Sequence, residues 1–546
     1  MKTSHVLFGL GGIAGLVVFV VYYDAAFPAA AIDLDLSREA IAQRATDYVR
    51  ARGIDPDTFQ STLTFQVDET AADFLQRVRG LEATSRFARE QLALWNWRAR
   101  WFRSGETEEY VLRLTPDGRP LRYAHIIPDA AAGDSLSQDS ARAAATTFLR
   151  DQLDVDVASW RLEDQSTQAR DNRIDHSFTW EKLGSKIEWR PDDPEAGTAS
   201  MRLSVQVHGS EIGGFSRYLE VPEQFVRDQG KTTSLGQLLT IISLGLMLVL
   251  IIAAAAVTIV RFKQDRVRWR PGFVAGGLVA LTVLASGVLS LPLLKSQYST
   301  EVAYPTFLGI AAIGGLIAAI LYCLAIAVST AAGESLAADS FPRGIRGWRD
   351  WTARRWVTGE TAGEVLRGYA VGLVFLGYIT VFYLLGQRYL GVWLPADSPH
   401  SELLSMYLPW LVPLLIGTQA ALSEELLLRL FAVSFVKRYA RLTVVALVVP
   451  AMIWAFGHSN YPVYPVYVRG IELTVAGTFF GWIFIRYGLL ATVLAHYTID
   501  AVLIAMPLLR AAGGGYVYYG VVALAFAAAP LVVPVLWAVR GRPATA

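Results

Sequence analysis

The sequence predicts a polytopic α-helical membrane protein that carries an α+β domain outside the membrane. Two observations support this fold class. Hydrophobic residues make up 53% of the 546 residues and charged residues only 18%, a balance that water-soluble cores alone rarely accommodate. The charges are also unevenly distributed. Residues 32–232 are polar, whereas residues 233–546 consist of long apolar runs separated by short basic loops.

The first apolar run, Val6–Tyr23, follows Lys2 and is long enough to cross a bilayer, which takes about 17–25 residues. The segment AFPAAA at 26–31 has the small residues of a signal-peptidase site, so cleavage of this run as a signal peptide is an alternative. We favour an uncleaved anchor and assign residues 1–31 to it.

Apolar runs bounded by charge, proline or glycine indicate membrane helices after the polar region. With the first run they predict about ten spans. One run is so long that we expect a broken or interfacial segment within it, at 404–436. We divide the helices into two successive groups, residues 233–403 and 404–546. The predicted spans after the polar region lie at about 234–260, 273–294, 305–330, 368–387, 404–436, 442–458, 470–486, 488–508 and 516–539.

Basic residues in the short loops determine the predicted orientation, because cytoplasmic loops are enriched in lysine and arginine. Loops on one side of the predicted helices carry eighteen such residues, whereas those on the other side carry four: Lys295, Arg388, Arg469 and Arg510. This asymmetry places both termini in the cytoplasm and residues 32–232 on the extracytoplasmic face. We therefore expect an integral protein of a bacterial cytoplasmic (inner) membrane.

The polar region contains an internal repeat. Leu36–Ala40 (LSREA) is echoed by Leu136–Ser140 (LSQDS), and matching positions follow at the same offset. In each copy a serine begins an acidic first turn, which is typical of a helix N-cap. Alternating segments such as Tyr110–Leu114 and Met201–Val207 predict strands. We interpret the region as two helix-plus-meander units, which loosely resemble PepSY-type modules. A generic α+β domain with a chance repeat is the alternative.

Composition excludes several classes of function. The formal net charge of +1 gives no sign of nucleic-acid binding. The one cysteine, Cys323, excludes an internal disulfide framework and a multi-cysteine zinc site. His125, His176 and His208 in the polar region have no metal-ligand spacing, and we interpret them as ordinary surface or core residues.

Ionisable residues inside a bilayer are costly, by about 2.5–3.5 kcal/mol or more at a helix centre, and those that occur are usually paired or functional. In this chain they concentrate in the last third. Three motifs in separate predicted helices contain them: Glu424, Glu425 and Arg429 in SEELLLR, His458 in WAFGH, and His496 and Asp500 in HYTID.

Helix geometry separates the two glutamates. Glu425 and Arg429 are four residues apart, so they share a helix face and can form an ion pair. Glu424 is about 100° away around the helix and is left to point elsewhere. His496 and Asp500 again share one face. Counting from the basic loops at about 1.5 Å per residue brings Glu424, both motif histidines and Asp500 to a similar depth. Such groups facing one cavity can bind and deprotonate water.

The three motifs, Glu-Glu-x-x-x-Arg, aromatic-x-x-x-His and His-x-x-x-Asp, resemble those of the CPBP family. This family comprises CAAX proteases and bacteriocin-processing enzymes, also called Abi proteins, and its members are intramembrane endopeptidases of the Rce1 type. The resemblance covers about 404–510, under a fifth of the chain. Two positions depart from the family pattern. Trp454 stands where phenylalanine is usual, and Asp500 stands where the prenyl proteases carry asparagine.

The resemblance implies a function and roles for the residues. The chain would hydrolyse peptide bonds of a membrane-associated protein or peptide, and residues 404–546 would be the protease helices. Glu424 would be the general base that activates water. Glu425 and Arg429 would be a structural pair.

The same resemblance implies that His458 and His496 hold the water and stabilise the oxyanion, while Asp500 orients the nucleophile or an imidazole. Two histidines with Glu424 are also an acceptable three-ligand set for zinc or another divalent metal, as in a metalloprotease. We lean toward a metal-independent mechanism in which glutamate and histidine activate the water. The motifs His-Glu-x-x-His, Gly-x-Gly-Asp and Gly-x-Ser-x-Gly are absent from the sequence, so other protease chemistries fit poorly.

Two non-proteolytic functions remain open. The polar cluster could join helices in a membrane scaffold or immunity protein. Buried Glu, His and Asp could also form the proton relay of a transporter, although no repeated hydrophobic halves support this. Taken singly, each motif is also compatible with a structural pair or an interfacial histidine. The expected partners are the lipid bilayer, which the arginines at 343–355 face, and a membrane-associated substrate. Nucleic acid is not expected.

Overall fold

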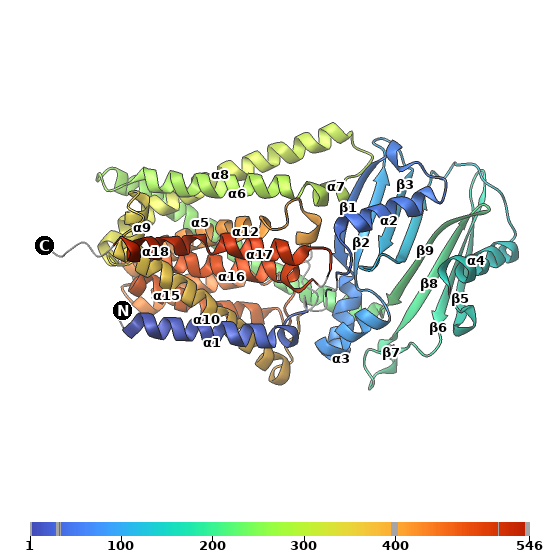
Figure 1. Cartoon of the computed structure of the whole chain (residues 1–546), viewed down its shortest axis with the longest axis horizontal. Helices are drawn as coiled ribbons and strands as arrows, with labels where there is room; N and C mark the ends of the chain where they lie inside the picture. Colours follow the sequence, from blue (N-terminus) through green and yellow to red (C-terminus); the bar gives the residue numbers. More distant parts are fainter. Residues whose placement is uncertain (1–2, 29–31, 33, 395–401, 512, 541–546) are drawn as a thin grey trace.

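The computed structural model describes residues 3–28, 32, 34–394, 402–511 and 513–540. A β-sheet domain lies at one end of a bundle of long helices (Figure 1). The first helix begins and the last helix ends at the opposite end of the bundle. Residues 29–31 of the possible cleavage site lie outside the described residues, as do Lys2 and Arg542 of the basic segments.

The strands of the described chain form one antiparallel sheet in the order β1-β2-β3-β4-β9-β8-β6-β5, with β7 paired to β8. The two halves of the region join through β4 and β9. Strand β8 buries alternate side chains from Met201 to Val207, as expected for a strand with one face on a core. The predicted strands at 110–114 and 201–207 are confirmed. The strands are β1 (Gln60–Val67), β2 (Trp95–Phe102), β3 (Glu109–Leu114), β4 (Pro120–Ile126), β5 (Trp160–Ala169), β6 (Ile174–Lys182), β7 (Ile187–Glu188), β8 (Thr198–His208) and β9 (Glu211–Glu220).

Two helices of the sheet domain arise from the repeat, α2 (Arg38–Arg50) and α4 (Gln138–Leu153). The N-cap prediction is confirmed in both. The hydroxyls of Ser37 and Ser137 each accept a hydrogen bond, at 3.2 Å, from the backbone N–H three residues further on. A third helix, α3 (Glu69–Glu90), lies between β1 and β2 and has no counterpart in the repeat. Sequence analysis did not predict it.

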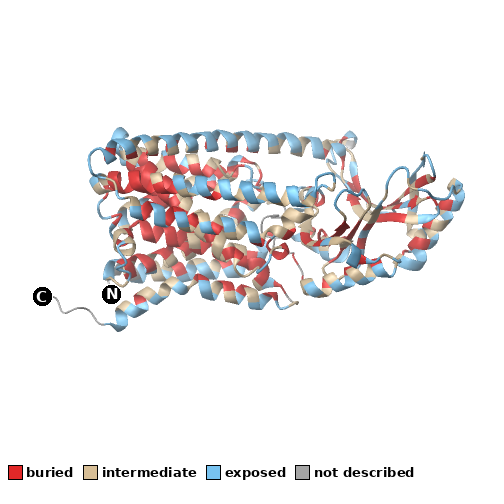
Figure 2. Ribbon diagram, turned by 90° about the horizontal axis from the view of Figure 1, so that it is seen from above, coloured by how far each residue is buried: buried red, intermediate tan, exposed pale blue. Residues whose placement is uncertain are grey.

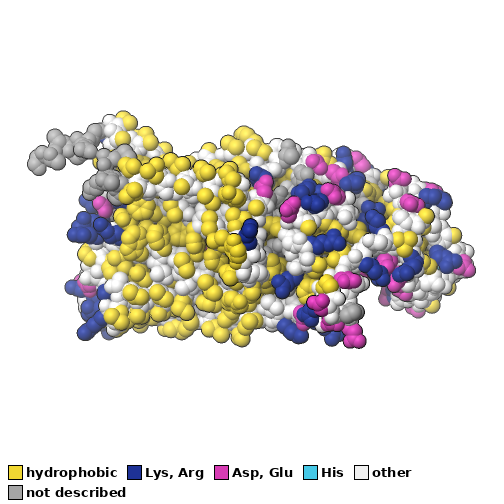
Figure 3. Space-filling model, turned by 90° about the horizontal axis from the view of Figure 1, so that it is seen from below, with side chains coloured by type: hydrophobic (Ala, Val, Ile, Leu, Met, Phe, Trp, Pro, Cys, Tyr) yellow, Lys and Arg dark blue, Asp and Glu magenta, His cyan; other side chains and the backbone are white. Residues whose placement is uncertain are grey.

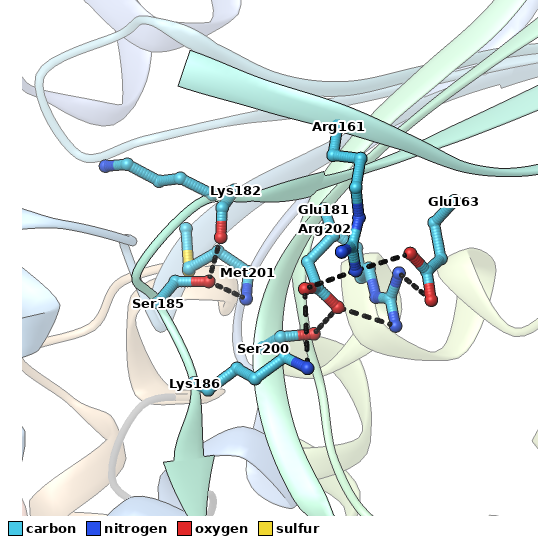
Figure 4. Close-up of polar contacts among 9 residues, drawn as sticks. All are labelled: Arg161, Glu163, Glu181, Lys182, Ser185, Lys186, Ser200, Met201 and Arg202. Atoms are coloured by element: carbon cyan, nitrogen blue, oxygen red, sulfur yellow. Dashed lines mark hydrogen bonds and ion pairs between the residues drawn. The ribbon is translucent and has the colours of Figure 1, made fainter.

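A row of opposite charges crosses the second half of the sheet (Figure 4). Arg161 and Arg202 lie opposite Glu181 on the two neighbouring strands, at nitrogen–oxygen distances of 3.3 Å and 3.2 Å. Glu163 lies 2.9 Å from Arg161 and 3.9 Å from Arg202. Cross-strand pairs of opposite charge stabilise a sheet. Here they tie the edge strand β5 to β8 through β6.

Eight helices within the described residues are long and apolar enough to cross a membrane. On the face shown in Figure 3, apolar side chains cover the bundle, and charged side chains gather at its end and over the sheet domain. Buried residues concentrate in the inner helices (Figure 2). The chain is therefore an integral membrane protein. The eight are α1 (Thr3–Ala26), α5 (Glu223–Phe262), α6 (Trp269–Leu289), α8 (Tyr304–Ser340), α10 (Gly359–Tyr389), α15 (Tyr467–Tyr487), α16 (Leu489–Arg510) and the run of α17 (Tyr516–Ala527), η7 (Ala529–Leu531) and α18 (Val532–Val539).

The two remaining predicted spans are interrupted or short. The span predicted at 404–436 is broken, as expected, and α14 has only 14 residues, about 21 Å against a hydrocarbon thickness of about 30 Å. The prediction of ten spans therefore stays a prediction. The elements here are η5 (Leu403–Ser405), α12 (Val412–Glu424), η6 (Glu425–Val433), α13 (Ser434–Ala440) and α14 (Thr443–Phe456), and two short helices, α7 (Leu291–Ser296) and α9 (Arg346–Thr352), lie earlier in the chain.

One hydrophobic cluster extends from the core of the sheet domain into the adjoining end of the bundle. Leu404 and Tyr516 of the bundle are buried with the core side chains of the sheet. Edge strand β1 is covered by η5, because the Ser405 hydroxyl accepts the N–H of Phe65 at 2.7 Å and donates to its carbonyl at 3.3 Å. Helix α5 begins at Glu223, directly after β9, and continues into the bundle. The predicted division between residues 232 and 233 thus lies inside one helix.

Helix α1 packs closely against α10. A Cβ added at Gly15 would collide with the backbone oxygen of Leu373, so the two backbones are nearly in contact. Small residues permit such close approach between membrane helices. Phe19 and Tyr23 on α1 are also buried. The first apolar run is therefore a packed member of the bundle.

Candidate active site

The segment that follows Glu424 is a π-helix rather than the α-helix that the spacing predicted. Helix η6 continues α12, and every residue of it is buried. The wider turn of a π-helix joins residues five apart and is frequent at functional sites. Arg429 still lies about one turn from Glu425, so the predicted pair forms. The Arg429 guanidinium lies 3.1 Å from Glu425 Oε1.

Glu425 also contacts the third motif. Its Oε1 lies 2.8 Å from His496 Nδ1. Glu425 is fully buried and Arg429 is 1% exposed, so neither charge is solvated by water. The guanidinium lies 4.4 Å from the centre of the Trp454 ring, a favourable cation–π geometry. Glu425 therefore connects η6 to α16, a contact that the sequence did not indicate.

Glu424 points in a different direction from Glu425, as predicted. Its carboxylate accepts a hydrogen bond from Trp454 Nε1 and lies 3.7 Å from His496 Nε2. Asp500 Oδ2 lies 3.5 Å from the same nitrogen. The side chains of Glu424 and Asp500 are 26% and 24% exposed, in contrast to the buried Glu425. Two accessible carboxylates therefore flank one imidazole nitrogen.

His458 lies just after α14 and is held by the residue one turn earlier. Its Nδ1 is 2.9 Å from the carbonyl oxygen of Trp454. A carbonyl only accepts hydrogen bonds, so Nδ1 carries a proton and Nε2 is the nitrogen left for the site. The Trp454 ring centre is 5.5 Å from that of His458 and 5.7 Å from that of His496. The three motifs thus meet around one indole.

Helix α5 supports the end of α14 that leads to His458. The Ser243 hydroxyl donates a hydrogen bond to the carbonyl of Ile453. Gly236 lies against the backbone oxygen of Ser459, where an added Cβ would collide. Because α5 begins in the sheet domain, it physically connects that domain to the His458 segment.

A carboxylate from α10 caps the N-terminus of α16, the helix that carries His496 and Asp500. Glu364 accepts hydrogen bonds from the N–H groups of Leu490 and Gly347, each at 3.0 Å. Helix α16 has no side-chain cap of its own. A negative charge is favourable at a helix N-terminus, where backbone N–H groups lack partners. Glu364 is fully buried and therefore helps to fix the position of α16.

Three buried carboxylates of the bundle, Glu334, Glu364 and Glu472, are not among the residues that the sequence motifs indicated. Glu364 precedes the predicted span at 368–387, whereas α10 already begins at 359. Glu472 lies inside the predicted span 470–486, where the rule that charges in a bilayer are paired would have identified it. Its carboxylate lies 2.5 Å from the Arg469 guanidinium and accepts the Tyr383 hydroxyl at 2.9 Å. Arg469 is one of the four basic residues assigned above to the loops on the extracytoplasmic side. In the structure it pairs with Glu472 inside the bundle.

The metal alternative gains no support from the ligand geometry. Within the described ranges, no group of three or more His, Cys, Asp and Glu side chains is placed to hold one metal ion. His458 and His496 each use Nδ1 in a hydrogen bond, which is common in metal-bound histidines. These two and Glu424 are nevertheless not gathered into a single ligand set. The carboxylates beside His496 Nε2 are groups that can transfer protons to and from water.

Comparison with known proteins identifies the family of this segment. Residues 406–502, which contain all three motifs, match the family described as type II CAAX prenyl endopeptidase Rce1-like. The chain is 20% identical over 517 residues to the sporulation-killing factor biosynthesis protein SkfC of Bacillus subtilis strain 168, a match that covers 92% of this chain and 95% of that protein. No solved structure matches the chain. The membrane segment that carries the three motifs belongs to the CPBP family, as the motifs predicted.

Proposed function

We propose that this protein is an intramembrane endopeptidase that hydrolyses a peptide bond of a membrane-associated protein or peptide. The observation that carries the proposal is the convergence of Glu424 and Asp500 on His496 Nε2, at 3.7 Å and 3.5 Å. Both carboxylates are partly exposed, while the neighbouring Glu425 and Arg429 are buried. The family match supports a protease in general terms.

In this mechanism Glu424 is the general base. It takes a proton from a water molecule, whose oxygen attacks the carbonyl carbon of the scissile peptide bond. The carbonyl oxygen becomes the oxyanion of a tetrahedral intermediate. The proton then passes from Glu424 to the leaving nitrogen as the C–N bond breaks. Such a positioned base contributes typically a factor of about 100 to 10,000 in rate.

The histidines act on the same water and oxyanion. In this mechanism Nε2 of neutral His458 accepts a hydrogen bond from the water. Nε2 of His496 faces two carboxylates, so it carries a proton, which it donates to the oxyanion to stabilise it. Asp500 orients the His496 ring through Nε2, and Glu425 holds it through Nδ1. We propose that this chemistry needs no metal.

We further propose that the sheet domain lies on the extracytoplasmic face of a bacterial inner membrane. Basic residues of the short loops gather at the other end of the bundle (Figure 3). The domain then meets or excludes substrates on that face. The relative SkfC is named for the biosynthesis of a sporulation-killing factor, so precursors of such factors are substrates to test first.

The test compares newly formed peptide termini in membranes that contain the wild type, Glu424→Ala or Glu424→Gln at matched protein levels. Glu301→Gln, a substitution at an exposed position, is the matched control. We expect termini that appear with the wild type and the control but with neither Glu424 variant. Identical termini from all four folded proteins would contradict the proposal and favour the scaffold or immunity function.

The metal-independent mechanism has its own test. Cleavage by the purified protein is measured after exhaustive chelation of divalent metals. We expect unchanged activity. Loss of activity that zinc restores would contradict the metal-independent mechanism while leaving the protease function intact.

A further inference from the structure

A cavity lined by α9 and α18 lies toward the end of the bundle that is far from the sheet domain (Figure 1). Its volume is about 420 Å³, within the usual range of small-molecule pockets. Its lining comes from α6, α9, α10, α12, α16, η7 and α18. None of the six candidate catalytic residues lines it. Residues of its wall include Leu278, Trp351, Trp356, Leu422, Val493 and Val533.

The wall of this cavity is largely apolar, and two of its three tryptophans use their N–H groups in hydrogen bonds to other groups. Trp348 Nε1 donates to Glu334 at 2.6 Å, and Trp356 Nε1 donates to the carbonyl of Trp351 at 3.1 Å. The lining therefore offers mainly carbon atoms to an occupant. Tryptophan is also enriched where a membrane meets water. The cavity thus has the lining and the position to take a hydrocarbon chain.

The segment that carries these tryptophans also carries unneutralised positive charge. Arg343, Arg346 and Arg354 are exposed and form no ion pair within the described residues. Arg355 differs, because Asp350 lies 2.6 Å from its guanidinium. Positive side chains at the membrane surface attract anionic lipid headgroups. A zwitterionic lipid would fill the same cavity without balancing the three arginines.

We propose that this cavity binds one acyl chain of an anionic phospholipid, whose headgroup lies on Arg343, Arg346 and Arg354. The apolar lining accounts for the chain, and the arginines account for the selectivity. This site is independent of the proposed protease function.

The test uses the purified full chain in mild detergent with an equimolar mixture of phosphatidylglycerol and phosphatidylethanolamine that carry the same acyl chains. Native mass spectrometry counts the retained lipids. We expect preferential retention of one phosphatidylglycerol. Val533→Trp fills the cavity and should abolish retention. Val535→Trp, on the same helix but 60% exposed and outside the lining, should leave retention unchanged.

The charge is tested separately. Replacing Arg343, Arg346 and Arg354 by glutamine should reduce the preference for phosphatidylglycerol by roughly fivefold per arginine, without loss of lipid binding. Arg438→Gln, at an exposed position on α13, is the control. Equal retention of both lipids by the wild type would overturn the proposal.

Unchanged lipid retention by folded Val533→Trp would also overturn it. If this variant keeps its lipid but loses cleavage, the cavity is a substrate site instead. Thermal unfolding checks that the variants fold. Thr418→Phe, which fills the cavity from α12, replaces Val533→Trp if the latter does not fold.

Discussion

The indole N–H of Trp454 donates a hydrogen bond to the carboxylate of Glu424. This contact joins the aromatic position of the second motif to the proposed base of the first. Phenylalanine is usual at this position in the CPBP pattern, and a phenyl ring has no donor. The departure noted in the sequence therefore adds a contact that holds the proposed base.

Trp454→Phe should keep the fold and slow cleavage. The phenyl ring retains most of the packing, but the hydrogen bond to a charged group, worth about 1.5–3 kcal/mol, is lost. We expect a fall in cleavage rate of roughly tenfold or more, together with a moderate fall in thermal stability because the buried indole loses this bond and some packing. Trp482→Phe, at a side chain that is 40% exposed, is the control. An unchanged rate would show that the indole only packs.

Arg429→Met should strongly destabilise the protein. It leaves Glu425 charged and buried without its guanidinium, which costs about 3–5 kcal/mol. Adding Glu425→Gln should recover part of the loss, because it removes the unpaired charge. The measurement is thermal unfolding of both variants, with the exposed Arg438→Met as the control. Purely additive effects would mean that the two residues are not coupled.

Local patterns made part of this structure predictable. The N-caps at Ser37 and Ser137 depend on a few neighbouring residues, and the structure has both. The six candidate site residues could be chosen because charges are rare in apolar segments. The same rule applied to Glu472 would have identified its ion pair.

Features that depend on tertiary contacts could not be predicted. The π-helix η6 changes the hydrogen-bond register without changing the apolar pattern. The contact of Glu425 with His496 joins residues 71 positions apart. The role of Glu364 could not be predicted either, because its partners are backbone N–H groups of two other segments, and every residue except proline has such a group.

Glu364→Ala should destabilise the bundle and lower cleavage. The substitution leaves two buried N–H groups without an acceptor, at a cost of about 1–3 kcal/mol each. We expect a lower unfolding temperature and a reduced rate, because α16 carries His496. Glu360→Ala, one turn earlier on α10 and exposed, should change neither. Equal unfolding temperatures for the two variants would contradict the capping role.

Gly15→Leu should weaken the packing of α1 on α10. The new side chain collides with the backbone of Leu373, and overpacking typically costs about 1–3 kcal/mol. Gly9→Leu on the same helix should be tolerated, because nothing lies within 4 Å of a Cβ there. Thermal unfolding of the two variants tests this.

The intact mass of the purified wild type shows whether the first helix α1 is retained or cleaved as a signal peptide. We expect it to be retained.

Asp73 should make the stability of the sheet domain depend on pH. Burial raises its pKa to about 8, and the charge of Glu69 acts in the same direction, while a hydrogen bond from Gln229 at 3.1 Å opposes both. Between pH 3.8, the ordinary pKa, and about 8, the folded chain keeps a proton that the unfolded chain has lost. The contribution of Asp73 to stability therefore falls as pH rises through this window and stays constant above it.

Asp73→Asn removes this titration and should stabilise the protein relative to the wild type, increasingly so as pH rises to about 8. The measurement is thermal unfolding of both proteins between pH 4 and 9, with the exposed Asp192→Asn as the control. The difference between Asp73→Asn and the wild type should grow with pH, whereas the control should follow the wild type. A constant difference across this range would show that Asp73 is ionised in the folded protein throughout, and that the contact with Gln229 outweighs the burial.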